Sequence, residues 1–156
     1  MQATTQDLGA SDFIQLTTFR RTGEGVPTPV WVVPDGDALA MFTPVGAGKL
    51  KRIAHTSRVT VAPCSRRGAV ADGVVPLDAT ATTSGDQAEV DRVTRMLAKK
   101  YGLQFKVVML VERVFARGGR RREVIRVTLG GGGASTPAPE GEAHREQLTP
   151  EGDAAR

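Results

Sequence analysis

Thr43–Cys64 reads TPVGAGKLKRIAHTSRVTVAPC, which joins a loop of small residues to a short helical pattern and then to an apolar strand pattern. Leu50, Ile53 and Ala54 recur at i, i+3 and i+4, so we expect them to face the core from one side of a helix. Val59–Cys64 is typical of a buried strand. The stretch therefore predicts a loop, a short helix and a strand in succession.

Three cations stand at the start of this predicted helix: Lys49, Lys51 and Arg52. A helix N-terminus already carries partial positive charge on its free N–H groups, so cations there weaken an isolated helix. They are explained if an anion such as a phosphate binds at this end, close to the small residues at positions 46–48. The alternative is a basic helix face in contact with solvent.

The composition indicates one globular domain. The chain has 156 residues, of which 40% are apolar and only 4% aromatic, so aliphatic residues must fill most of the core. The single cysteine, Cys64, excludes an internal disulfide, and we expect it to be a small buried hydrophobic residue. No signal peptide or membrane-spanning segment is visible, so a soluble cytoplasmic protein is expected.

The two ends of the chain differ from the middle. We expect residues 1–10 to be a flexible N-terminus and residues 130–156, which are rich in Gly, Pro and Glu, to be a disordered tail. The tail holds five of the 17 acidic and two of the 21 basic residues, which leaves a formal charge of +7 on residues 1–129, against +4 for the whole chain. This charge favours an anionic partner.

Short alternating segments separated by turns predict six strands. They are 13–18, 26–33, 38–43, 59–64, 74–83 and 124–129. Pro27 and Pro29 lack the N–H that a sheet ladder needs, so the second segment should lie at an edge and expose free carbonyls. The pattern favours a small barrel with helices packed outside it.

Two helices are expected between the fifth and sixth strands. Asp86–Tyr101 has core positions at helical spacing, with Asp86 and Glu89 in the pattern of a capping box. Leu103–Phe115 has the length of a helix and the valine content of a strand, and we favour a helix.

The sequence contains no familiar catalytic constellation. His55 is the only histidine of the predicted domain, and neither Ser57 nor Ser65 has an identifiable base. Metal sites need more ligands than Cys64 and the two histidines provide. If the protein is an enzyme, a bound cofactor must therefore supply the chemistry.

Three segments together resemble a known family. FIQLTTFRRTGEGVPTPVWVV at 13–33, ALAMFTPVGAGKLKRI at 38–53 and SRVTVAPCSRRG at 57–68 are similar to the flavin-like split-barrel proteins, the relatives of pyridoxamine phosphate oxidase. Within that family the chain resembles the branch assigned as deazaflavin (coenzyme F420)-dependent oxidoreductases. The resemblance covers about residues 11–129.

This resemblance implies a six-stranded antiparallel split barrel, mainly β with flanking helices, and a homodimer with a cofactor groove at its interface. It implies an enzyme that transfers a hydride between F420 and a small organic substrate, whose identity the sequence does not give. The family's cofactor-binding positions map onto nine residues, which are Thr28, Pro29, Val30, Trp31, Thr43, Gly48, Lys49, Lys51 and Arg52.

The loop before the helix departs from the family pattern. Ala47 stands where relatives often have a serine, which removes one hydroxyl contact to a phosphate, and Pro44 and Gly46 make the loop less polar than expected.

Several alternatives stay open. The cofactor is FMN in a second hypothesis, although three adjacent cations suit the polyanionic F420 better. In a third, the protein binds a flavin, a deazaflavin or heme without turnover. Trp31 is equally well read as a core aromatic residue. The basic segment Arg117–Arg122 fits a solvated loop better than a nucleic-acid patch, because no recognition motif accompanies it.

Overall fold

The computed structural model describes the backbone of residues 4–115 and 121–130, with side chains up to Val111 and again from Arg121. In chain order its elements are α1 (Thr5–Ala10), β1 (Ile14–Phe19), β2 (Gly25–Val30), β3 (Val33–Asp35), β4 (Ala38–Pro44), α2 (Gly48–His55), β5 (Arg58–Pro63), β6 (Leu77–Ser84), α3 (Gln87–Tyr101), α4 (Leu103–Phe115) and β7 (Arg122–Leu129).

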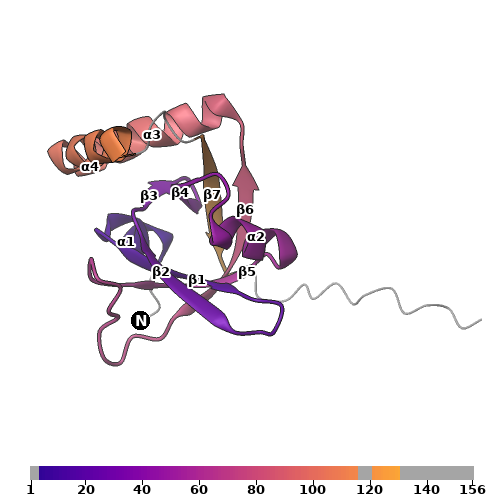
Figure 1. Ribbon diagram of the computed structural model, residues 1–156. Coiled ribbons are helices and arrows are strands. Elements are labelled where there is room, and N and C mark those ends of the chain that lie inside the picture. The colour runs from indigo at the N-terminus through magenta and orange to yellow at the C-terminus, as the bar shows by residue number, and fades with distance from the viewer. Residues whose placement is uncertain (1–3, 116–120, 131–156) are drawn as a thin grey trace, which may run out of the picture.

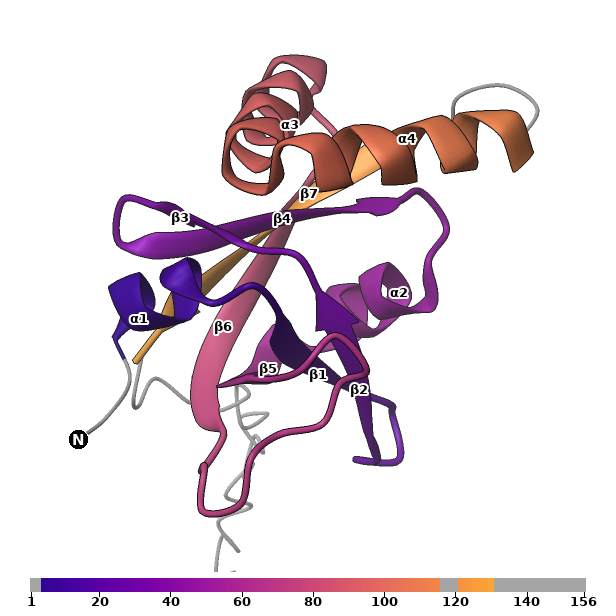
Figure 2. The same ribbon diagram turned by 90° about the vertical axis from the view of Figure 1, so that its left-hand side faces the viewer.

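Seven strands form one sheet in the order β2-β1-β5-β6-β7-β4-β3, and every neighbouring pair is antiparallel. The sheet curls, so that β1, β2 and β5 lie below β3 and β4, while β6 and β7 join the two parts (Figure 1). Figure 2 shows α1 and α2 on opposite sides of the space that the sheet encloses. The mainly β, antiparallel architecture with flanking helices is confirmed, but as a half-barrel with one more strand than predicted.

The extra strand arises because the predicted segment 26–33 is divided. Trp31 and Val32 separate β2 from β3, and these two strands lie at opposite edges of the sheet. Two residues of α3 hold the segment between the two strands. Lys100 Nζ donates to the carbonyl of Val32 at 2.7 Å, and the Tyr101 hydroxyl accepts from the Val32 N–H at 3.1 Å. These bonds satisfy the backbone of Val32 outside any strand ladder.

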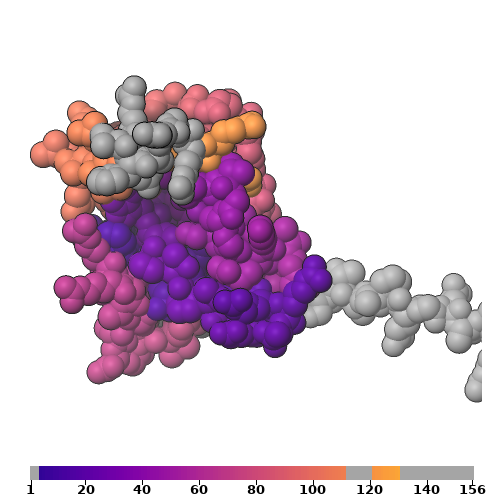
Figure 3. All heavy atoms as spheres, viewed as in Figure 1, coloured from indigo at the N-terminus to yellow at the C-terminus, as the bar shows by residue number. Residues whose placement is uncertain are grey.

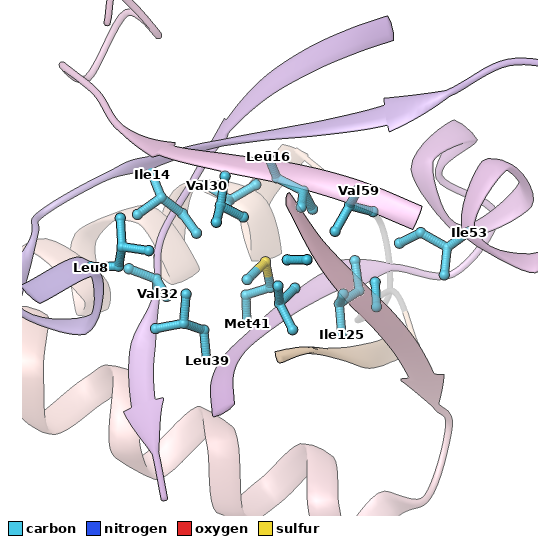
Figure 4. Packing of buried hydrophobic residues seen from close by; sticks show 14 of the residues in the cluster. Leu8, Ile14, Leu16, Val30, Val32, Leu39, Met41, Ile53, Val59 and Ile125 are labelled. Carbon is cyan, nitrogen blue, oxygen red and sulfur yellow. The ribbon is translucent and has the colours of Figure 1, made fainter. Parts of the chain in front are cut away.

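The main core fills the inside of the half-barrel. Figure 4 shows Leu8 of α1 at one end and Ile53 of α2 at the other, with residues from the sheet between them. Ile14, Leu16 and Val59 are fully buried. Each such side chain stabilises the fold by roughly 1.5 to 3 kcal/mol. The core therefore fixes where α2 sits, because Leu50 and Ile53 belong to it.

A second core cluster lies between the sheet and the α3–α4 layer. Val93 and Leu97 are buried there, and Phe105 of α4 is 5% exposed. The helical assignment that we favoured for Leu103–Phe115 is confirmed. The predicted helix at Asp86–Tyr101 is also confirmed, although it begins at Gln87.

The predicted capping box of this helix does not form. Asp86 occupies the N-cap position, but its side chain caps no backbone N–H. Glu89 instead lies 3.6 Å from Arg126 of β7. The carboxylate that the local pattern assigns to the helix end is therefore used in a tertiary ion pair.

Three other local predictions are corrected by the structure. The expected flexible N-terminus is helical over Thr5–Ala10, where Thr4 and Asp7 form a capping box and Leu8 enters the core. The strand expected at 74–83 is β6, which begins at Leu77. Ala54 is exposed, because only Leu50 and Ile53 of α2 reach the core.

The predicted tail lies almost entirely outside the described residues, as does most of the basic segment Arg117–Arg122. Among the helices of the described ranges, none is long and apolar enough to span a membrane.

Candidate functional site

The site is built around the N-terminus of α2. β4 ends at Pro44, Gly46 turns the chain with a φ of +84°, and Ala47 occupies the N-cap position. Alanine has no side-chain acceptor, so no side chain caps the first turn, and this turn holds no acidic residue. The free N–H groups and the helix dipole therefore make this end of α2 positive.

An open cavity of about 320 Å³ lies beside this helix end. Its volume is at the lower end of the ~300 to 1,000 Å³ range of ligand sites. The residues that line it are Phe19, Arg20, Arg21, Gly48, Lys51, Arg52 and His55. They come from the end of β1 and from α2, which lie next to each other in Figure 3. The lining includes four permanent cations and no carboxylate, so the cavity suits an anion.

Arg52 is the best-fixed cation of the cavity. Its Nε donates to Thr18 Oγ1 at 2.7 Å, and Thr18 is 1% exposed. The guanidinium lies over Gly48, because a Cβ added at Gly48 would stand 3.0 Å from Arg52 Nη1. A planar cation is thus held next to a positive helix end, which is an arrangement that binds phosphate well.

Two further lysines of α2 add to this charge. Lys51 is exposed and lines the cavity, whereas Lys49 is half-buried and does not line it. Burial lowers the pKa of Lys49, and the charge of Arg52 lowers it further. No carboxylate among the described residues pairs with Lys49, so a bound anion would relieve an unfavourable charge.

Arg20, Arg21 and His55 were not among the predicted site residues. Arg20 pairs with Glu24 across the β1–β2 turn at 3.2 Å. The sequence shows an arginine pair before a turn, but it does not show that β1 ends beside α2. The sequence shows an excess of basic residues in the domain, but this excess does not indicate which of them line a site.

The nine predicted positions do not all meet in this cavity. Gly48, Lys51 and Arg52 line it, while the segment 28–31 and Thr43 are not part of its lining. Thr28 is half-buried in the edge strand β2, opposite Leu16 of β1. Thr43 is 2% exposed and pairs with Glu123 of β7.

The other predicted positions lie in β2 and in the segment that joins β2 to β3. Pro29 is exposed and packs near Gly68, and Val30 belongs to the main core. Trp31 stacks on Tyr101 with ring centroids 5.0 Å apart and contacts Phe105 at 5.9 Å. Its indole Nε1 is buried and has no hydrogen-bond partner among the described atoms. As the alternative reading proposed, Trp31 is part of an aromatic core cluster.

The cations that line the cavity suit the binding of an anion. Within the described ranges, no group of three or more His, Cys, Asp and Glu residues could hold a metal ion. Cys64 is half-buried, and burial raises the pKa of its thiol, which disfavours the reactive thiolate. The cation set with the open helix end fits the phosphate of a nucleotide-like cofactor.

Comparisons with known proteins place this geometry in context. Residues 2–132 match the family model described as pyridoxamine 5'-phosphate oxidase. A search of the curated proteins finds no match.

Solved structures show the same fold at low sequence identity. An F420 reductase is 14% identical, with a TM-score of 0.55 over 83% of this chain and 95% of its own. A FAD-binding protein from Mesorhizobium loti is 15% identical, with a TM-score of 0.55 over 83% and 91%. HutZ, a heme storage protein from Vibrio cholerae, is 13% identical, with a TM-score of 0.58 over 82% and 86%.

Proposed function

Because the chain belongs to the pyridoxamine 5'-phosphate oxidase family, we propose that it is an oxidoreductase that binds coenzyme F420 and acts on a small organic substrate. The observation that carries the proposal is the cavity at α2, where Gly48, Lys51 and Arg52 meet without any carboxylate. The solved structures with this fold include an F420 reductase.

The residues of the cavity fit the phosphate of such a cofactor. Arg52 would donate to phosphate oxygens from a side chain that Thr18 holds in place, and Lys51 would add a mobile point charge. The free N–H groups of the first turn of α2 would bind the same group. When bound, the deazaflavin would supply hydride transfer, and this chain would orient the cofactor and exclude water.

The ring of the cofactor needs more surface than this cavity provides. Its volume suits a phosphate and its neighbouring atoms, and the segment 28–31 lies outside its lining. We therefore keep the homodimer as part of the proposal. In support, α4 exposes an apolar face that a monomer seldom leaves uncovered. The exposed residues of this face are Leu103, Val107, Leu110 and Val111.

FMN is the second candidate cofactor, because the family and one structural neighbour point to flavins in general. F420 is favoured because the cavity has more cations than a single terminal phosphate needs. A titration of the purified protein with each cofactor, followed by fluorescence, distinguishes the two. Tighter binding of FMN would reject F420 as the cofactor. Tight binding of either cofactor without reduction of any acceptor would indicate a binding protein that is not an enzyme.

A matched pair of lysine variants tests the site itself. Lys51→Ala should weaken cofactor binding about fivefold, because a contact between exposed charges contributes at most about 1 kcal/mol. Lys99→Ala removes an exposed lysine of α3 and should leave binding unchanged. Equal losses in both variants would show that only net charge matters, and would remove the support that the cavity gives to the proposal.

A further inference from the structure

The cavity has two groups of cations that come from different elements. Lys51 and Arg52 project from α2, whereas Arg20 and Arg21 follow the end of β1. The hydrogen bond from Arg52 to Thr18 joins the two elements, so their relative position is fixed by a buried contact. A ligand in this cavity therefore meets both groups at once.

One phosphate does not account for all of this charge. At neutral pH a terminal phosphate carries at most about two negative charges, which Lys51, Arg52 and the helix end already match. Arg20 and Arg21 then remain as further cations of the lining, from a different part of the chain. Another arginine, Arg58, lies outside the lining, with its guanidinium carbon 4.6 Å from the centroid of the Phe19 ring. Arg58 has its own acid, Asp78, at 3.2 Å, so it is not part of the unmatched set.

Glu24 is the only carboxylate found paired with these hairpin arginines in the described structure. It lies 3.2 Å from Arg20, and the two side chains are 68% and 55% exposed. An ion pair as exposed as this stabilises the protein weakly, so a ligand anion can replace it at low cost. Glu24 therefore acts as an internal competitor for Arg20.

We infer that the cavity binds a ligand with two separate anionic groups, one at the N-terminus of α2 and the other at Arg20 and Arg21, and that Glu24 competes for this outer subsite. The inference rests on the proposed function for the identity of the ligand, since F420 carries a phosphate and a carboxylate tail. The outer subsite thus selects for a second anionic group, and singly phosphorylated ligands gain nothing from it.

The test measures the affinity of four probes by calorimetry at one ionic strength: inorganic phosphate, tripolyphosphate, FMN and F420. Arg20→Gln/Arg21→Gln should weaken tripolyphosphate and F420 about tenfold, while phosphate and FMN change by less than about twofold. Glu24→Gln should strengthen tripolyphosphate and F420 about twofold to threefold. Arg66→Gln/Arg67→Gln is the matched control, because it removes an exposed arginine pair from another turn outside the cavity lining.

The outcomes separate this inference from the proposed function. Equal losses for FMN and F420, or equal losses in the control variant, overturn the two-subsite inference. If F420 binding depends on Lys51 but not on Arg20 and Arg21, the inference fails while the proposed cofactor stands. If tripolyphosphate binding depends on Arg20 and Arg21 while neither cofactor binds, the subsite is supported and the proposed function fails.

Discussion

Two clusters of arginine in this protein differ in how their charge is balanced. Arg92 of α3 and Arg126 of β7 both pair with Asp35, and Glu89 adds a second carboxylate. The arginines at α2 face a cavity whose lining holds no acid. The first cluster ties a helix to two strands, whereas under the proposed function the second keeps charge available for a ligand. On that proposal, matched charge marks a structural role here and unmatched charge marks a binding role.

The largest expected effect comes from removing the acid of the matched cluster. Asp35 is 15% exposed at its side chain and accepts two hydrogen bonds of 2.9 Å from Arg92. Asp35→Ala leaves Arg92 and Arg126 without this partner, and should lower the free energy of unfolding by about 2 to 3 kcal/mol. Urea unfolding measures this loss, and affinity for FMN or F420 should not change.

Asp72→Ala is the control, since Asp72 lies exposed in the loop before β6 and no described residue pairs with it. A comparable loss of stability in both variants would contradict the structural role of the matched cluster.

The same cluster should make stability depend on acid pH. The hydrogen bonds from Arg92, and the charge of Arg126, lower the pKa of Asp35 in the folded protein. A carboxyl with a depressed folded pKa contributes stability above its unfolded pKa of about 3.9 and loses it as pH falls through the folded value. Urea midpoints at pH 7, 4 and 3 should therefore fall more steeply for the wild type than for Asp35→Ala. Parallel pH curves would show that other carboxyls dominate.

The unmatched cluster should respond in the opposite way. Arg52→Gln removes the fixed guanidinium, and should weaken cofactor binding about tenfold. Its stability cost should stay within about 1 kcal/mol, because only the bond to Thr18 is lost. Fluorescence titration and urea unfolding together give both quantities. A large stability loss with unchanged affinity would erase the distinction between the clusters.

The local parts of the fold followed from local patterns in the sequence. The spacing of Leu50 and Ile53 predicts the buried side of α2, and Gly102 after Lys99 and Lys100 predicts the end of α3. These features depend on neighbours within one or two turns of the helix. The length of Leu103–Phe115 also favoured a helix, which the structure confirms.

The misses have long-range causes. The segment 26–33 reads as one strand, and its division depends on Lys100 and Tyr101, almost 70 positions later. Arg20 and Arg21 join the cavity because β1 ends beside α2. Glu89 forms an ion pair with Arg126 and does not form the expected capping box. No local pattern contains these partners, so the site could be predicted only where its residues share one helix.

The smallest expected effect concerns Lys49, whose charge is unmatched but does not line the cavity. Its half-buried ammonium lies near Arg52 at a positive helix end, so Lys49→Gln should raise the free energy of unfolding by about 0.5 kcal/mol. The pKa of Lys49 is lowered in the folded protein, so the wild type should gain stability as pH rises from that lowered pKa towards the ordinary lysine pKa of 10.5. The variant should lack this gain, as thermal melts from pH 8 to 10.5 would show.

Added phosphate should reduce the difference between wild type and Lys49→Gln, because a bound anion offsets the charge that the variant removes. Lys99→Gln serves as the control, since it removes a lysine from a helix C-terminus, where a cation is favourable, and should slightly lower stability. A clear loss of stability in Lys49→Gln would mean that its ammonium holds the fold together. In that event the charge of Lys49 would no longer indicate a ligand, and the contrast between the two arginine clusters would rest on the cations that line the cavity.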